Sequence, residues 1–195
     1  MGGKRGVLHY LHRVAIQGHP DAVQALTGRY IPGAARPEAN PHLFRQYFED
    51  MRIGDTVTTD KHLVTLQDIE DFAELSGDKF YAHMDASALE GTIFTGRVAH
   101  GYFILSRAAG LFVDPPKGPV LLNYGIEYCR FTKPVYPGTT VGVRFTVQEK
   151  IDQEKRPEED VAKGIVKFYV EVYDDQDDVV AVAVILTMVK KHADA

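Results

Sequence analysis

The chain has only one cysteine, Cys129, among its 195 residues. No disulfide can therefore form within it, and this cysteine usage predicts a cytoplasmic protein. No run of apolar residues is long enough to cross a bilayer. Residues 1–20 lack the apolar core and the small-residue cleavage site of a secretory signal. We therefore expect neither secretion nor a membrane partner.

The chain also has no excess of positive charge. The 22 Lys and Arg residues are outnumbered by 27 Asp and Glu residues, which gives a net charge of −5. This balance argues against a nucleic-acid partner. The histidines show no metal-binding spacing such as H-E-x-x-H, and no G-x-G-x-x-G follows a predicted strand. We therefore predict no metal and no nicotinamide cofactor.

The length fits one well-buried domain, preceded by a section without an evident core. Residues 1–41 form that section: a mixed apolar pattern followed by a linker that contains Pro37 and Pro41. We interpret this section as an N-terminal arm and place the domain at residues 42–195.

Within the domain, two helices and a set of strands are predicted. Thr65 and Asp68 resemble a capping box that opens a helix through residues 66–75. Residues 101–112 are apolar on nearly all sides, which is typical of a buried helix. Strands are expected at 56–59, 120–131, 139–150, 164–173 and 179–190, and 174–178 reads as a solvated turn. The sequence thus predicts an α+β fold in which an antiparallel sheet wraps around one buried helix.

The candidate chemistry lies between the two helices. Asp78 and His83 are five residues apart, which would place them roughly 140° apart on a continuous helix. Gly77 can end the first helix in a left-handed conformation, so a loop could bring the acid and the imidazole to one site. A carboxylate beside a histidine can activate water. Taken alone, an aspartate after Ser-Gly is more often a turn residue, and a lone histidine more often structural.

Residues 72–89 resemble the signature of MaoC-like (R)-specific enoyl-CoA hydratases, in which a histidine follows a Gly-Asp pair five residues after the aspartate. The resemblance implies the hot-dog fold, an acyl-CoA substrate, and no cofactor beyond the coenzyme A of that substrate. It implies that Asp78 and His83 are catalytic and that the Gly101 N–H holds the thioester oxyanion. It also implies a homodimer or a higher homo-oligomer.

A narrower resemblance is to the hydratase domains of the PaaZ family, the fusion proteins of aerobic phenylacetate degradation. It is carried by Ser76–Asp85, Arg97–Phe103, Ala108–Asp114 and Gly118–Val120. The first 41 residues resemble the tail of the fused aldehyde dehydrogenase domain, which suggests an aldehyde dehydrogenase partner. The implied reaction is the ring opening of oxepin-CoA. Phe80-Tyr81 and Ala109 depart from the general hydratase pattern and agree with this narrower family.

Three functions stay open at this point: oxepin-CoA hydrolase, general hydratase of linear enoyl-CoAs, and non-catalytic oligomerisation module. A hot-dog thioesterase is a further rival, but it would usually place an acid on the central helix, and residues 103–112 contain none. Tyr81, Tyr102 and Phe103 could line an acyl pocket, although such aromatics are more often core. Arg97, Arg130 and Lys133 could meet coenzyme A phosphates, although solvation is the commoner role. His100 is expected to be a structural residue at the start of the helix.

Overall fold

The computed structural model describes residues 41–192, which belong to one compact unit beginning at Pro41. The N-terminal arm predicted at residues 1–41 therefore lies almost wholly outside the described residues. Within the part described, no helix combines the length and the apolar character needed to span a membrane.

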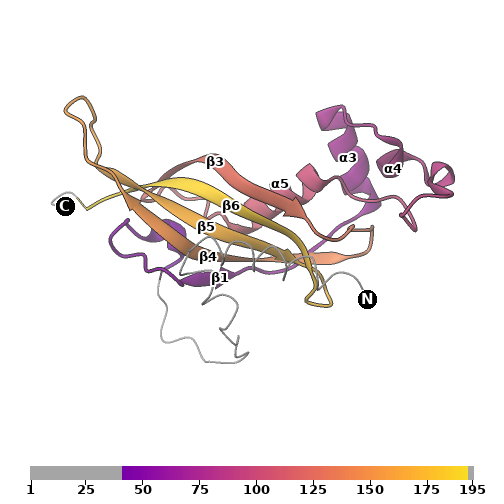
Figure 1. The fold of residues 1–195 in the computed structure, drawn as a ribbon, viewed down its shortest axis with the longest axis horizontal. Coiled ribbons are helices and arrows are strands. Elements are labelled where there is room, and N and C mark those ends of the chain that lie inside the picture. The colour runs from indigo at the N-terminus through magenta and orange to yellow at the C-terminus, as the bar shows by residue number, and fades with distance from the viewer. Residues whose placement is uncertain (1–40, 193–195) are drawn as a thin grey trace, which may run out of the picture. The chain divides into compact units, whose positions relative to one another are not determined.

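Short elements come first and the long strands come last (Figure 1). The helical elements are η1 (Leu43–Arg45), α3 (Leu66–Ser76), α4 (Tyr81–Met84), η2 (Ala86–Leu89) and α5 (Gly101–Phe112). The strands are β1 (Thr56–Thr58), β2 (His62–Leu63), β3 (Val120–Phe131), β4 (Thr140–Asp152), β5 (Lys163–Tyr173) and β6 (Val179–Lys190). The predicted strand positions are confirmed to within two residues.

All pairings in the sheet are antiparallel. The strand order is β1-β4-β5-β6-β3, and β2 pairs separately with β4. The three longest pairings join β4 to β5, β5 to β6, and β6 to β3, and the first two are between strands that follow each other in the chain. Among the described strands β3 pairs only with β6, so its second edge is open.

The core lies between the sheet and α5. Along β5, Val166, Phe168, Val170 and Val172 are buried and alternate with less buried residues, as the two-residue period of a strand predicts. They share one apolar cluster with Phe103, Ile104, Ala108 and Phe112 of α5. The structure is thus an α+β hot-dog fold, as expected, with an antiparallel sheet against a central helix.

Two expectations need correction. The helix α5 is not buried on all sides, because Tyr102, Ser106 and Gly110 form an exposed stripe at a spacing of four residues. The turn at 174–178 is not merely solvated either. The Asp174 side chain is 5% exposed and binds the Lys133 Nζ at 2.6 Å, and it also accepts hydrogen bonds from the backbone N–H groups of Gln176 and Asp178.

This buried carboxylate should contribute measurably to stability. Burial raises the pKa of Asp174, but the hydrogen bond from Lys133 and those from the backbone of Asp178 and Gln176 outweigh burial and hold the pKa below its ordinary value. We expect Asp174→Asn to lower the free energy of unfolding by about 1–3 kcal/mol. The pKa of Asp174 is lower in the folded than in the unfolded chain, where it is about 3.9. The charged carboxylate therefore adds its whole contribution to the free energy of unfolding above that unfolded pKa. This contribution is lost as the pH falls through the folded pKa.

Urea unfolding at several pH values measures this difference. Asp175→Asn, in the same turn but exposed, is the control and should change stability little. An Asp174→Asn effect no larger than that of the control would contradict the stabilising role.

Candidate active site

The end of α3 determines where Asp78 lies. The predicted capping box at Thr65 and Asp68 is present, and Gly77 ends the helix with φ 76°. In this left-handed conformation glycine pays no Cβ penalty. The Asp78 backbone N–H donates to the Ser76 Oγ at 3.2 Å, and the Asp78 Oδ1 accepts from the Phe80 N–H at 3.2 Å. Asp78 therefore does have the turn role that its sequence context suggests, but its carboxylate stays exposed.

The sequence suggested that His83 lies in a loop. In the structure it lies on the short helix α4. Its Nδ1 is 2.8 Å from the carbonyl oxygen of Val98. Since a carbonyl can only accept, Nδ1 carries the proton and Nε2 is left as an acceptor. The Arg97 Nε also donates to the His83 carbonyl oxygen at 2.6 Å. His83 is thus held from both its ring and its backbone, and no hydrogen bond to its Nε2 is found among residues 41–192.

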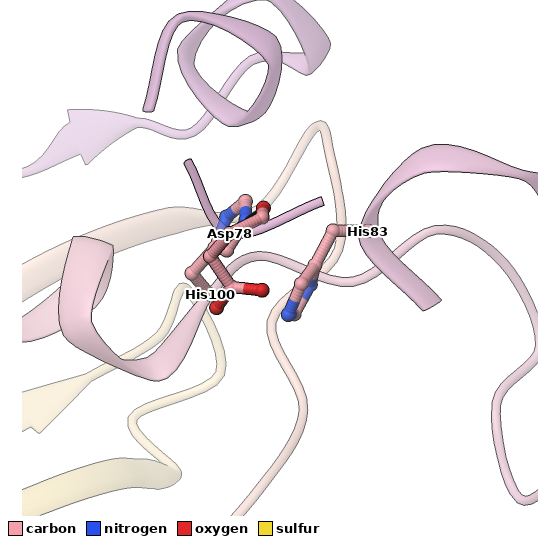
Figure 2. A group of neighbouring side chains, drawn as sticks. All are labelled: Asp78, His83 and His100. Atoms are coloured by element: carbon pink, nitrogen blue, oxygen red, sulfur yellow. Dashed lines mark hydrogen bonds between the residues drawn. The ribbon is translucent and has the colours of Figure 1, made fainter. Parts of the chain in front are cut away.

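A third residue, His100, joins the pair at the start of α5. Its Nε2 donates to the Asp78 carbonyl oxygen at 2.9 Å, and its ring stacks on the His83 ring with centroids 3.7 Å apart. One ligand atom from each of Asp78, His83 and His100 lies within 4.8 Å of the others (Figure 2). The structure thus brings together the two residues predicted as catalytic. It adds a histidine that the sequence assigned only a structural role, because no spacing rule connects position 100 to position 78.

These three side chains could be considered as metal ligands, since His100 supplies the third ligand that the sequence did not identify. Their arrangement does not suit a tetrahedral ion well. Imidazoles that share such an ion at about 2.0–2.1 Å diverge from it, whereas the rings of His83 and His100 lie face to face with an interplanar angle of 28°. The geometry fits acid–base chemistry better.

Gly101 is the first residue of α5, as expected. Within residues 41–192 no acceptor is found for its N–H, and the N-terminal end of a helix favours negative charge. The structure places a side chain beside this glycine that the sequence did not reveal. A Cβ on Gly101 would lie 2.5 Å from the Cε2 of Phe131, so the Phe131 ring occupies that space.

The three candidate pocket aromatics are in different environments. Tyr81 is 40% exposed and lies against Phe80 with ring centroids 4.4 Å apart. Tyr102 is 70% exposed and contacts the ring of Phe131 edge-on. Phe103 points instead into the core, where it is 6% exposed. Tyr81 and Tyr102 are therefore accessible to a ligand in the single chain, and Phe103 is a core residue.

The basic residues near the site have partners. Arg97 pairs with Glu70 at 3.0 Å, and Lys133 pairs with Asp174 and Asp178. Arg97 is therefore more buried than the solvated position expected for it, whereas Lys133 is exposed, as expected, and also forms ion pairs. Arg130 lies over the ring of Tyr128.

Two shallow hollows of the described region do not include Asp78 or His83 among their lining residues. One, of about 360 Å³, is lined by Glu70, Asp71, Glu74, Arg97 and two uncharged residues. The other, of about 430 Å³, is basic and is lined by Arg45, Lys117, Lys190 and their neighbours. Asp78 itself is exposed in the single chain, whereas His83 is partly buried.

The sequence matches the MaoC like domain family over residues 49–167. The chain belongs to this family. It is 46% identical to Protein MaoC of Klebsiella aerogenes over 162 residues, which is 83% of this chain but 48% of that protein. It is 31% identical to the (R)-specific enoyl-CoA hydratase of Rhodospirillum rubrum, covering 58% of this chain and 77% of the relative.

Among solved structures, this MaoC-like chain resembles the monoamine oxidase regulatory protein from Archaeoglobus fulgius. The TM-score is 0.69 at 29% identity, over 76% of this chain and 96% of the other. The MaoC-like match includes α3, Asp78, His83, α5 and most of the sheet. The chain spans about half the length of the Klebsiella protein it matches.

The contact between Gly101 and Phe131 gives a testable consequence. Gly101→Ala must displace the Phe131 ring or shift the start of α5, and such overpacking costs about 1–3 kcal/mol of unfolding free energy. In a Phe131→Ala background the same change should cost much less, because the ring is gone. Urea unfolding of the four variants of this double-mutant cycle gives the coupling energy. Equal costs of Gly101→Ala in both backgrounds would show that Phe131 is not the reason for glycine.

Proposed function

We propose that this MaoC-like domain is an enoyl-CoA hydratase-type enzyme that adds water across an activated double bond of a CoA thioester. The observation that carries the proposal is the convergence of Asp78 and His83 beside the start of α5. In the neutral tautomer that the Val98 carbonyl selects, His83 offers Nε2 as an acceptor, and Asp78 offers an exposed carboxylate. The relative from Rhodospirillum rubrum, named as an (R)-specific enoyl-CoA hydratase, supports this class of reaction.

In the proposed reaction one water lies between the two groups. One group takes a proton from the water while the other orients it. The oxygen bonds to the β-carbon, and the electrons of the double bond move to the thioester oxygen. The Gly101 N–H stabilises the resulting negative charge, as a donor aimed at a developing oxyanion does. Return of a proton to the α-carbon completes the addition.

For the substrate we propose oxepin-CoA. Water added across the enol-ether double bond of the ring would give a cyclic hemiacetal, and breakage of its ring C–O bond would release an open-chain aldehyde. Phe80 and Tyr81 support a ring-shaped substrate, because they place two contacting aromatic rings where MaoC-like hydratases commonly have Asn-Pro. These rings are close to the pair, since the centroids of the Phe80 and His83 rings are 6.0 Å apart. In a PaaZ-type pathway a cytoplasmic aldehyde dehydrogenase partner would oxidise this aldehyde.

The alternative is a general (R)-specific hydratase of linear enoyl-CoAs. It is favoured by the relative of that name, of which this chain covers 77%. Turnover of oxepin-CoA beside crotonyl-CoA separates the two functions. We expect a higher kcat/KM with oxepin-CoA, and a clear preference for crotonyl-CoA would replace our substrate with the linear one.

Substitution of the pair tests the reaction class with either substrate. Asp78→Asn and His83→Ala should each lower kcat by about a hundredfold to ten-thousandfold, the contribution typical of general acid–base groups. If the two act on one water, the double variant should be little slower than the slower single variant. Circular dichroism should show an unchanged fold, since neither change removes a large apolar surface. Near-full turnover by Asp78→Asn would return Asp78 to its turn role alone.

We further propose that the chain works as a homodimer joined through β3. The open edge of this strand carries five large apolar side chains that are exposed in the single chain: Leu121, Leu122, Tyr124, Ile126 and Phe131. An exposed apolar edge strand invites pairing with another chain. Its end at Phe131 reaches Gly101, so a partner on this edge would also border the open site.

A charge placed on this edge should weaken the dimer. In a two-fold interface the residue at each position is present on both subunits, so Ile126→Lys would bring in two buried charges. We expect light scattering and sedimentation to show a shift toward monomer at micromolar concentration. Ile93→Lys is the matched control, because Ile93 is 89% exposed but lies outside the sheet. A monomeric wild-type chain, or equal dimerisation of both variants, would argue against the β3 interface.

A further inference from the structure

His100 is unusual among the polar residues of the described region. It is 1% exposed and directly precedes the first residue of α5. Three contacts hold its ring: the hydrogen bond to the Asp78 carbonyl oxygen, the stacking on His83, and a tilted contact with Phe72 at 5.1 Å. This single imidazole therefore connects α3, the Asp78 turn, α4 and α5.

The protonation of His100 follows from these contacts. Its Nε2 faces a carbonyl, so it must be the N–H donor. Its Nδ1 is buried and has no partner within residues 41–192. A second proton there would be a buried unpaired donor, which is costly. Burial lowers the pKa of His100, and the nearby His83 lowers it further against the opposing effect of Asp78. The ring is therefore neutral near pH 7.

Neutrality suits a residue beside a proton-transfer pair. A neutral His100 does not compete with His83 for the proton of the water, and it places no second positive charge 3.7 Å from the ring that would become charged. Its hydrogen bond reaches only the main chain of Asp78, so the Asp78 carboxylate stays available. The contacts of His100 thus hold both Asp78 and His83 and leave the Asp78 carboxylate and the His83 Nε2 available.

We propose that His100 is a positioning residue for the Asp78–His83 pair. Its N–H fixes the turn that carries Asp78, and the face of its ring fixes the plane of His83, so that both side chains meet one water. This inference rests on the proposed hydratase function for its kinetic consequence. Its structural part, the coupling of His100 to the Asp78 turn, can be measured without any substrate.

Two substitutions separate the two contacts. His100→Gln keeps an N–H donor near the position of Nε2 but removes the stacked ring. His100→Phe keeps a ring against His83 but removes the donor. We expect each to lower kcat substantially, with KM changed little, and His100→Ala, which removes both contacts, to lower kcat by about a hundredfold, because a misplacement of about 1 Å can cost that much.

His62→Gln is the matched control. His62 is a partly buried histidine whose Nε2 has no hydrogen-bond partner within residues 41–192 and lies 3.7 Å from the Asp68 Oδ2, and no contact joins it to Asp78 or His83 among the described residues. It should leave kcat and KM near the wild-type values. Thermal unfolding of all variants checks that a loss of kcat is not a loss of folded protein.

Amide hydrogen exchange provides the readout that needs no activity. The Phe80 N–H donates to the Asp78 Oδ1, so loosening of this turn should speed its exchange in His100→Phe and much less in His100→Gln. If the wild type shows no hydratase activity but Phe80 exchange responds in this way, the proposed function fails and the positioning role stands. If kcat and Phe80 exchange in both His100 variants match those of the His62 control, the positioning role is wrong.

Discussion

The packing of α5 against the inner face of the sheet is the contact on which the site depends. Phe103, Ile104, Ala108 and Phe112 bury one side of this helix in the core. Because these residues fix the helix axis, they also fix its N-terminus, where His100 and Gly101 lie. The site is therefore located by apolar burial several residues away from any reacting group, and polar contacts only refine its geometry.

The next level of organisation is a set of hydrogen bonds to backbone carbonyls. His83 uses Nδ1 on the Val98 carbonyl, and His100 uses Nε2 on the Asp78 carbonyl. Each bond fixes one tautomer and leaves the other nitrogen without a proton. The two imidazoles are stacked, yet they have different surroundings: His100 is buried and His83 only partly so. Of the two rings, His83 is therefore the one that solvent or a ligand can reach.

The single chain leaves apolar side chains of β3 and the Asp78 carboxylate open to solvent. The exposed side chains of β3, the stripe on α5 and the exposed Asp78 are all features that a second subunit could cover. Phe131 belongs both to the open strand and to the surroundings of Gly101. Assembly and the environment of the site would therefore be linked through this one residue in the proposed dimer.

Local patterns in the sequence were sufficient for the two longer helices and the long strands, but not for the short helix α4. The capping box at Thr65, the left-handed Gly77, the long strands and the span of α5 all depend on neighbours close in the chain, and all are present in the structure. The Asp78–His83 spacing after Gly77 allowed a shared site, and the resemblance to MaoC-like hydratases implied one and suggested their roles. Only the tertiary structure decided the contacts between distant segments. These are the bond from His100 to Asp78, the Phe131 ring over Gly101, the burial of Asp174 and Phe103, and the exposed stripe on α5. A sequence pattern reports which residues are neighbours along one helix or strand, whereas these contacts follow from how α5 and the sheet pack together.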